Sequence, residues 1–163
     1  PEESPLRAEP GLSVSRPFEV GRSLVELSSK ETPENERLHP AISQLFPMPN
    51  LYAHQDDALQ SLSANRNVLV STGTGSGKTE AFLLPIIDHC LKLRDEGAPE
   101  GLAALLIYPM NALASDQLDR LRELLAGTGI PYGMYVGLTP QDDASVSNVI
   151  QLNEGEEIGR AHV

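Results

Sequence analysis

TGTGSGKT, residues 72–79, is the stretch of sequence from which the expected fold follows. Its alternate glycines let several backbone N–H groups turn toward one point, with no Cβ in the way. The helix expected to start at Lys78 adds the partial positive charge of its N-terminus at the same point. Lys78 is placed to reach the β- and γ-phosphates of a nucleotide, and the Thr79 hydroxyl to ligate Mg²⁺. The stretch therefore predicts a polyphosphate-binding loop, although Thr72 stands where such loops usually have Gly. The alternative is a glycine-rich turn that binds nothing.

Apolar runs and helical patterns alternate around this loop. Residues 67–71 are short, apolar and β-branched, as in a buried strand, and a helix is expected from 78 to about 94. Residues 103–108 form a second continuous apolar run, followed by an amphipathic helix over about 112–126 and a third expected strand at 132–136. Strand, helix and strand at this spacing predict right-handed βαβ units. The expected fold class is therefore α/β, with a parallel sheet, helices on both of its faces and ligands at the carboxyl edge of the sheet.

Gln55 lies in the first turn of a further helix, expected over about residues 53–64. Asp56 and Asp57 occupy the same turn, where they complement the helix macrodipole. A glutamine amide offers a donor group and an acceptor group side by side, the pair needed to bind N7 and the N6 amino group of adenine. Because one helix and one strand separate Gln55 from Thr72, we expect both to contact one nucleotide. Without the loop, Gln55 would be interpreted as a solvated residue at a helix start.

Composition divides the chain into three parts. Residues 1–50 hold 8 of the 13 prolines and show little periodicity, so we expect a mostly extended, proline-rich lead-in. Within it, Gly21–Ser29 is compatible with a short strand or turn and Pro40–Phe46 with one or two helical turns; a disordered linker is the alternative. Residues 51–157 are expected to form the folded domain. The chain starts without Met, and residues 158–163 show no hydrophobic pattern, so we interpret them as a non-native tail on a truncated sequence.

Bulk composition narrows the classes of partner. The net charge of −11 has the wrong sign for holding nucleic acid by bulk electrostatics, so such contacts must be local, through backbone amides, hydroxyls and helix N-termini. The single cysteine, Cys90, excludes a disulfide framework or a cysteine-based zinc site and is expected to be a small core residue. No apolar run approaches the roughly 18 residues of a membrane span, and no signal peptide is visible. We therefore expect a cytoplasmic protein without a membrane partner.

Together, these motifs resemble the first RecA-like domain of superfamily 2 helicases of the DEAD/DEAH-box type. Residues 72–79 are similar to motif I of that family, Gln55 to the Q-motif glutamine, Pro109–Gln117 to motif Ia, and Gly137–Pro140 to the following nucleic-acid-contacting turn. The residue sequences of the motifs are similar to those of large bacterial Lhr-like helicases, including those of phage-defence systems. The resemblance implies ATP and Mg²⁺ as cofactors. It also implies a nucleic-acid partner, for which we favour DNA over RNA.

The expected site residues follow from the loop, from the glutamine amide and from this resemblance. The expected nucleotide contacts are Gln55, Thr72, Gly73, Thr74, Gly75, Ser76, Gly77, Lys78, Thr79 and Glu80. Lys78 and Thr79 are the expected catalytic residues, with Thr79 as the Mg²⁺ ligand. The expected nucleic-acid contacts are Pro109, Met110, Asn111, Gly137 and Thr139. Met110-Asn111 replaces the Thr-Arg frequent in motif Ia, which removes a charged phosphate contact from that motif.

Two parts of the family pattern are missing from the sequence. Motif II, an apolar strand ending in Asp-Glu-x-Asp/His, is not found; Val149–Glu154 comes nearest and does not fit. Without it the Mg²⁺ shell is incomplete and no Glu orients the attacking water. The second RecA-like domain, with its arginine finger, is absent too. We therefore expect helicase activity of a longer parent protein, and ATP binding without turnover by this chain. A stand-alone nucleotide-binding module and another phosphate-loop enzyme, such as a nucleotide kinase, stay open as alternatives.

Overall fold

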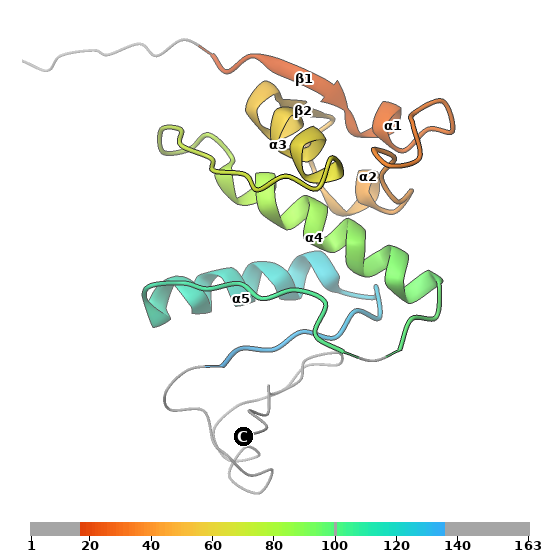
Figure 1. Ribbon diagram of the computed structural model, residues 1–163. Helices are drawn as coiled ribbons and strands as arrows, with labels where there is room; N and C mark the ends of the chain where they lie inside the picture. The colour runs from red at the N-terminus through yellow and green to blue at the C-terminus, as the bar shows by residue number, and fades with distance from the viewer. Residues whose placement is uncertain (1–16, 100, 136–163) are drawn as a thin grey trace, which may run out of the picture.

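A computed structural model describes residues 17–99 and 101–135 of the chain (Figure 1). In chain order its elements are β1 (Val20–Ser23), α1 (Leu24–Leu27), α2 (Ile42–Leu45), β2 (Asn50–Tyr52), α3 (Ala53–Ser63), α4 (Lys78–Asp95) and α5 (Asn111–Leu125). None of the described helices is both long and apolar enough to cross a membrane. The expected contacts Gly137 and Thr139, and the tail at 158–163, lie outside the described residues.

α4 is the central element of the molecule. Figure 1 shows β1, β2, α1, α2 and α3 on one side of it and α5 on the other. The apolar core consists of Leu24, Leu27, Leu38, Ile42, Phe46, Leu51, Leu59, Leu84, Ile87, Leu91, Leu125 and Ile130. One core therefore joins the residues that precede α3, the helix that follows the phosphate loop, and the end of α5.

Residues 17–52, here called the N-terminal clasp, pack onto α3 and α4. β1 and β2 pair antiparallel, with Val20 opposite Tyr52. Leu24 and Leu27 are both buried, because their spacing of three residues places them on one face of α1. The structure differs here from the mostly extended lead-in expected from the sequence. The prolines separate short elements, whereas the leucines between them reach the core.

The short elements expected within this segment are confirmed. β1 and α1 lie in the stretch 21–29 or at its edge, and α2 lies within 40–46. The three longer helices are also confirmed, each to within one residue of the expected bounds. Gly97 and Gly127 follow α4 and α5 with φ of +64° and +72°, the left-handed conformation that ends many helices. The pattern of apolar residues was therefore sufficient to locate these helices to within one residue.

The parallel sheet is not confirmed. The sheet of the described residues is the two-stranded β1–β2 pair, and no strand is formed at 67–71, 103–108 or 132–135. Leu69 is 93% exposed and Ile107 is 84% exposed, although both were expected to be buried on a covered sheet. Apolar content alone does not make a strand, because a strand needs a neighbour to accept and donate its backbone hydrogen bonds. Residues 67–71 and 103–108 lack that neighbour among the described residues, whereas Tyr132 forms an isolated bridge that does not extend into a strand.

Candidate nucleotide-binding site

The phosphate loop, residues 72–79, runs directly into the first turn of α4. Gly75 and Gly77 have φ of +75° and +71°, which a residue with a side chain adopts only under strain. Gly77 immediately precedes α4, so the unpaired N–H groups of the first turn face the loop. Ser76 is buried, and its hydroxyl lies 2.5 Å from that of Thr72. The loop thus has the local geometry of an anion site.

Lys78 folds back over this loop. Its Nζ donates to the backbone carbonyls of Thr72, at 2.7 Å, and of Gly73, at 2.6 Å. An ammonium group binds charged phosphate oxygens more strongly than neutral carbonyls. The cation is therefore held at the start of the loop by partners that a polyphosphate can replace.

Gln55 connects α3 with the end of the phosphate loop. Its Oε1 accepts from the Tyr52 N–H at 2.8 Å, and its Nε2 donates to the Gly77 carbonyl at 2.8 Å. The side chain is only 2% exposed. A glutamine amide has two N–H donors and two acceptor lone pairs, so one of each is left for a further partner. The structure brings Gln55 to the loop, as expected, but shows its amide engaged with the protein at both ends.

A side chain at Gly77 would displace the end of the Gln55 side chain. A Cβ at this position would lie 2.5 Å from Gln55 Nε2 and 3.1 Å from Glu80 Oε2. Positive φ favours glycine here, and the close approach means that any side chain would also disturb the Gln55 contact with the loop. The loop, α3 and the first turn of α4 meet at this residue.

Glu80 links the first turn of α4 to α5. Its Oε1 pairs with the guanidinium of Arg120. Thr79, between Lys78 and Glu80, is half-buried. Thr79 lies in the first turn of α4, and no group of three or more His, Cys, Asp or Glu side chains that could hold a metal ion occurs among the described residues. Glu80 is thus paired with Arg120 through one carboxylate oxygen, and its contact with a nucleotide stays a prediction.

An aromatic cluster lies at the start of α3, next to Gln55. The rings of Phe18, Tyr52 and His54 have centroids 5.2 to 5.9 Å apart. Phe18 and Tyr52 are both partly exposed. A groove of about 380 Å³ lies between α3 and residues 67–72, and its lining includes His54 and Thr72. The groove therefore extends from this cluster to the start of the phosphate loop.

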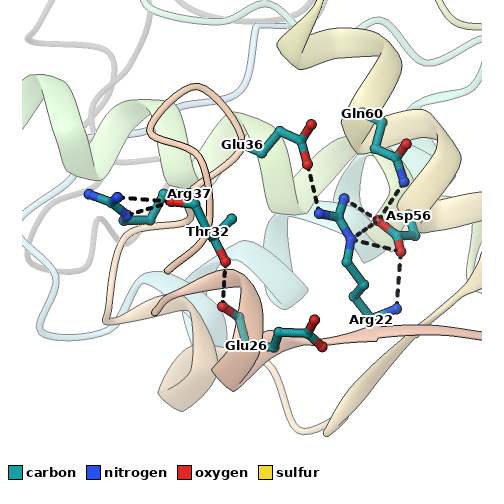
Figure 2. Close-up of polar contacts among 7 residues, drawn as sticks. All are labelled: Arg22, Glu26, Thr32, Glu36, Arg37, Asp56 and Gln60. Carbon is teal, nitrogen blue, oxygen red and sulfur yellow. Dashed lines mark hydrogen bonds and ion pairs between the residues drawn. The ribbon is translucent and has the colours of Figure 1, made fainter. Parts of the chain in front are cut away.

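Asp56, the neighbour of Gln55, is held by Arg22 of β1 (Figure 2). The Arg22 guanidinium donates from Nη2 to Asp56 Oδ1 at 2.7 Å, and its Nε and backbone N–H also donate to the carboxylate. Glu36 and Gln60 complete the cluster. Burial by itself would raise the pKa of Asp56, but the hydrogen bonds from Arg22 outweigh it, and the pKa lies below its usual value. The same contacts raise the pKa of Arg22, so the pair is fully ionised at neutral pH.

The residues expected to contact nucleic acid are only partly described. Met110 is exposed, and Asn111 is the first residue of α5. Pro109 directly precedes them, after the stretch 103–108, in which exposed and half-buried residues alternate. The Glu80–Arg120 ion pair links α5, the helix that starts in this segment, to α4, the helix that follows the phosphate loop.

Sequence reasoning missed three parts of the site: the Arg22–Asp56 pair, the aromatic cluster and Arg120. Asp56 was explained by the macrodipole alone, yet it is buried whereas Asp57 is exposed. Its spacing of three residues from Leu59, on the buried side of α3, was the signal that separates the two acids. The partners Arg22 and Phe18 come from a segment that was not expected to pack, so no sequence signal pointed to them.

Residues 52–153 match the family model of the DEAD/DEAH box helicases. This match covers more than half of the sequence, and the chain belongs to the DEAD/DEAH box helicase family. The family implies the RecA-like phosphate-loop fold, of which the described residues show the loop and its flanking helices but not the parallel sheet.

Individual relatives lie in several branches of this family. The Druantia protein DruE of Escherichia coli is 34% identical over 152 residues, which covers 80% of this chain and 8% of DruE. The ATP-dependent helicase HRQ1 of Saccharomyces cerevisiae is 38% identical over 89 residues, covering 55% of this chain and 8% of HRQ1. The ATP-dependent helicase Lhr-Core of Methanothermobacter thermautotrophicus is 35% identical over 102 residues, covering 56% of this chain and 12% of that protein. No solved structure gave a significant match.

Proposed function

We propose that this chain is the ATP-binding part of an ATP-dependent nucleic-acid helicase or translocase. The observation that carries the proposal is the phosphate loop itself, with Lys78 over its carbonyls and left-handed Gly77 at the start of α4. Family membership makes a nucleotide kinase the less favoured alternative. Because the chain spans 8 to 12% of the relatives named above, helicase activity is proposed for a longer protein that contains it.

ATP binding would begin with an exchange of partners at Lys78. The ammonium leaves the carbonyls of Thr72 and Gly73 for the β- and γ-phosphate oxygens, with which it forms charge-assisted hydrogen bonds. The N–H groups of the first turn of α4 then donate to the same phosphates. The loop needs little rearrangement for this step, because the glycines already hold the left-handed conformations that turn its backbone.

The base end of the nucleotide would lie at the start of α3. Tyr52 and Phe18 offer partly exposed rings there, and a ring face stacks on any base. Gln55 keeps one N–H and one lone pair for adenine, although its burial requires a small local opening. Selectivity for adenine through Gln55 is a proposal, supported by the contact of the same side chain with the loop.

A Mg²⁺ ion would be held by the Thr79 hydroxyl and by the phosphates of the nucleotide. Mg²⁺ keeps several waters and takes few protein ligands, so a single hydroxyl in this position is compatible with it. When bound, the ion neutralises charge that develops on the phosphates. The sequence offers no motif II acid beside it, so this chain is proposed to bind ATP with turnover near background.

Replacing Lys78 tests the nucleotide site. We expect Lys78→Ala to weaken ATP binding by about 100-fold, because a charge-assisted contact with the phosphates is lost. Isothermal calorimetry with ATP and ADP measures the change. The matched control is Lys30→Ala, which removes the same charge from an exposed position of the clasp. Equal ATP affinity of wild type and Lys78→Ala would refute the proposed site.

Turnover and nucleic-acid binding test the remaining part of the proposal. We expect ATP hydrolysis by the chain to stay near background, with or without nucleic acid. We expect single-strand binding to be weak and to fall steeply with salt, because the net charge of −11 opposes a polyanion. Fluorescence anisotropy with matched DNA and RNA oligonucleotides, from low to physiological salt, tests the expected preference for DNA. Robust hydrolysis stimulated by nucleic acid would mean that a catalytic acid is present after all.

A further inference from the structure

The N-terminal clasp meets the nucleotide site at one turn of α3. Gln55 and Asp56 are consecutive residues of this turn, and their side chains leave it in different directions. Gln55 reaches the Gly77 carbonyl of the phosphate loop, whereas Asp56 reaches Arg22 of β1. The turn is thus held from the loop on one side and from the clasp on the other.

The contact between Arg22 and Asp56 is close and specific. Figure 2 shows the guanidinium between the carboxylates of Asp56 and Glu36, with Gln60 on the far side of Asp56. Arg22 makes bonds of 2.7 to 3.1 Å to Asp56 through its side chain and its backbone N–H, and one of 2.7 Å to Glu36. The planar fork of an arginine fixes direction as well as charge, which a lysine does not.

The backbone of β1 at Gly21 lies very close to α3 at Asp56. A Cβ on Gly21 would lie 2.9 Å from Asp56 Cβ and 3.3 Å from the Tyr52 carbonyl, so β1 comes closer to α3 than a side chain allows. The Ala53 N–H donates to the Glu19 carbonyl at 2.8 Å, which ties the first residue of α3 to the chain just before β1. The start of α3 is therefore placed by β1 and not by its own sequence alone.

The buried charge makes the position of this turn depend on Arg22. The side chain of Asp56 is 8% exposed, and without Arg22 its carboxylate would be left largely without a countercharge. The turn would then relax so that the carboxylate reaches water. Because Gln55 and Asp56 share one rigid turn, such a movement also draws the Gln55 amide away from Gly77.

We propose that Arg22 is a positioning residue for the nucleotide site, acting through Asp56 and Gln55 on the Gly77 end of the phosphate loop. The N-terminal clasp then contributes to the geometry of the ATP site and does not only pack beside it. This inference rests on the proposed ATP binding for its affinity test, but not for its structural test.

The structural test needs no nucleotide. In the full chain, the side-chain amide protons of Gln55 are expected to exchange slowly with solvent in the NMR spectrum, because Gln55 is buried and its Nε2 donates to the Gly77 carbonyl. We expect Arg22→Gln to speed this exchange by about tenfold or more, in line with the loss of the one hydrogen bond between the buried Gln55 amide and Gly77. Arg37→Gln is the matched control: it removes an arginine of the same clasp that donates to the Lys30 and Thr32 carbonyls and not to α3.

A second substitution at Arg22 separates an effect on folding from an effect on the position of Gln55. Arg22→Lys keeps the charge but loses the fork, and we expect an intermediate exchange rate in a chain with wild-type circular dichroism. An unchanged Gln55 exchange rate in folded Arg22→Gln would overturn the proposal. If Arg22→Gln does not fold, an unchanged rate in folded Arg22→Lys would overturn it instead. So would equal acceleration in Arg37→Gln, which would assign the effect to general loosening of the clasp.

The affinity test is a double-mutant cycle. Arg22→Gln and Gln55→Ala should each weaken ATP binding by about tenfold, and the double variant should lose little more than either, because both act on one contact. Fully additive losses, or wild-type affinity of folded Arg22→Gln, would contradict positioning through Gln55. If Lys78→Ala also leaves ATP binding unchanged, the proposed function has failed instead, and the exchange rates alone then decide on Arg22.

Discussion

At the scale of single residues, Gly77 is constrained both by its backbone conformation and by the side chains close to it. Its φ of +71° is strained for any residue with a Cβ, and a Cβ there would also displace the end of the Gln55 side chain. Gly73 belongs to the same loop, yet a Cβ there meets nothing within 4 Å and its φ lies outside the left-handed region. Glycine therefore occupies these two positions of one motif for different physical reasons, which the sequence motif does not distinguish.

Alanine substitution of these two glycines separates those reasons. We expect Gly77→Ala to lower the free energy of unfolding by at least about 1–2 kcal/mol, because it combines a left-handed backbone with a clash against Gln55. We expect Gly73→Ala to change it by less than about 0.5 kcal/mol. Urea unfolding followed by circular dichroism measures both. A similar cost for the two variants would argue against the placement of Gln55 over Gly77.

At the scale of elements, the ion pair between Glu80 and Arg120 joins the helix after the phosphate loop to α5. The two side chains are 18% and 33% exposed, so water screens the pair only in part. α5 begins in the segment 109–111, which was expected to contact nucleic acid. A charge contact of this kind makes the placement of α5 depend on the first turn of α4.

A double-mutant cycle measures this contact. We expect Glu80→Gln and Arg120→Gln to show a coupling of about 0.5–1 kcal/mol in the free energy of unfolding. Glu80→Gln combined with Asp119→Asn should be additive, because the partner of Asp119 is Arg122 in α5. The coupling should shrink at high salt, since partly exposed charges are screened. No coupling at low salt would remove the proposed link between the two helices.

At the scale of the whole molecule, the core unites the N-terminal clasp with the helices around the phosphate loop. Leu27 and Leu38 of the clasp lie in the same cluster as Leu84 and Leu91 of α4. The loop between α1 and α2 is also tied to α4 by polar contacts, in which Lys92 Nζ donates to the Arg37 carbonyl at 2.6 Å. The clasp and the helices should therefore unfold together.

Two substitutions in α1 test this unity. We expect Leu27→Ala to destabilise the chain by about 2–5 kcal/mol, because it opens a cavity in the shared core. Val25→Ala, at a position that is 71% exposed, should cost less than about 0.5 kcal/mol. Hydrogen exchange should show faster opening of α4 in Leu27→Ala. Wild-type exchange in α4 would mean that the clasp unfolds independently.

The sequence by itself determined the phosphate loop, the three longer helices and the family. These features are local, because glycine spacing, helix periodicity and a lysine at a helix start act within a few residues of one another. Tertiary structure decided what those residues contact. Asp56 became a buried partner of Arg22 because a segment 34 residues away packed against its helix. Conversely, 67–71 and 103–108 form no strands among the described residues, since strand pairing requires a neighbour that apolar composition cannot supply.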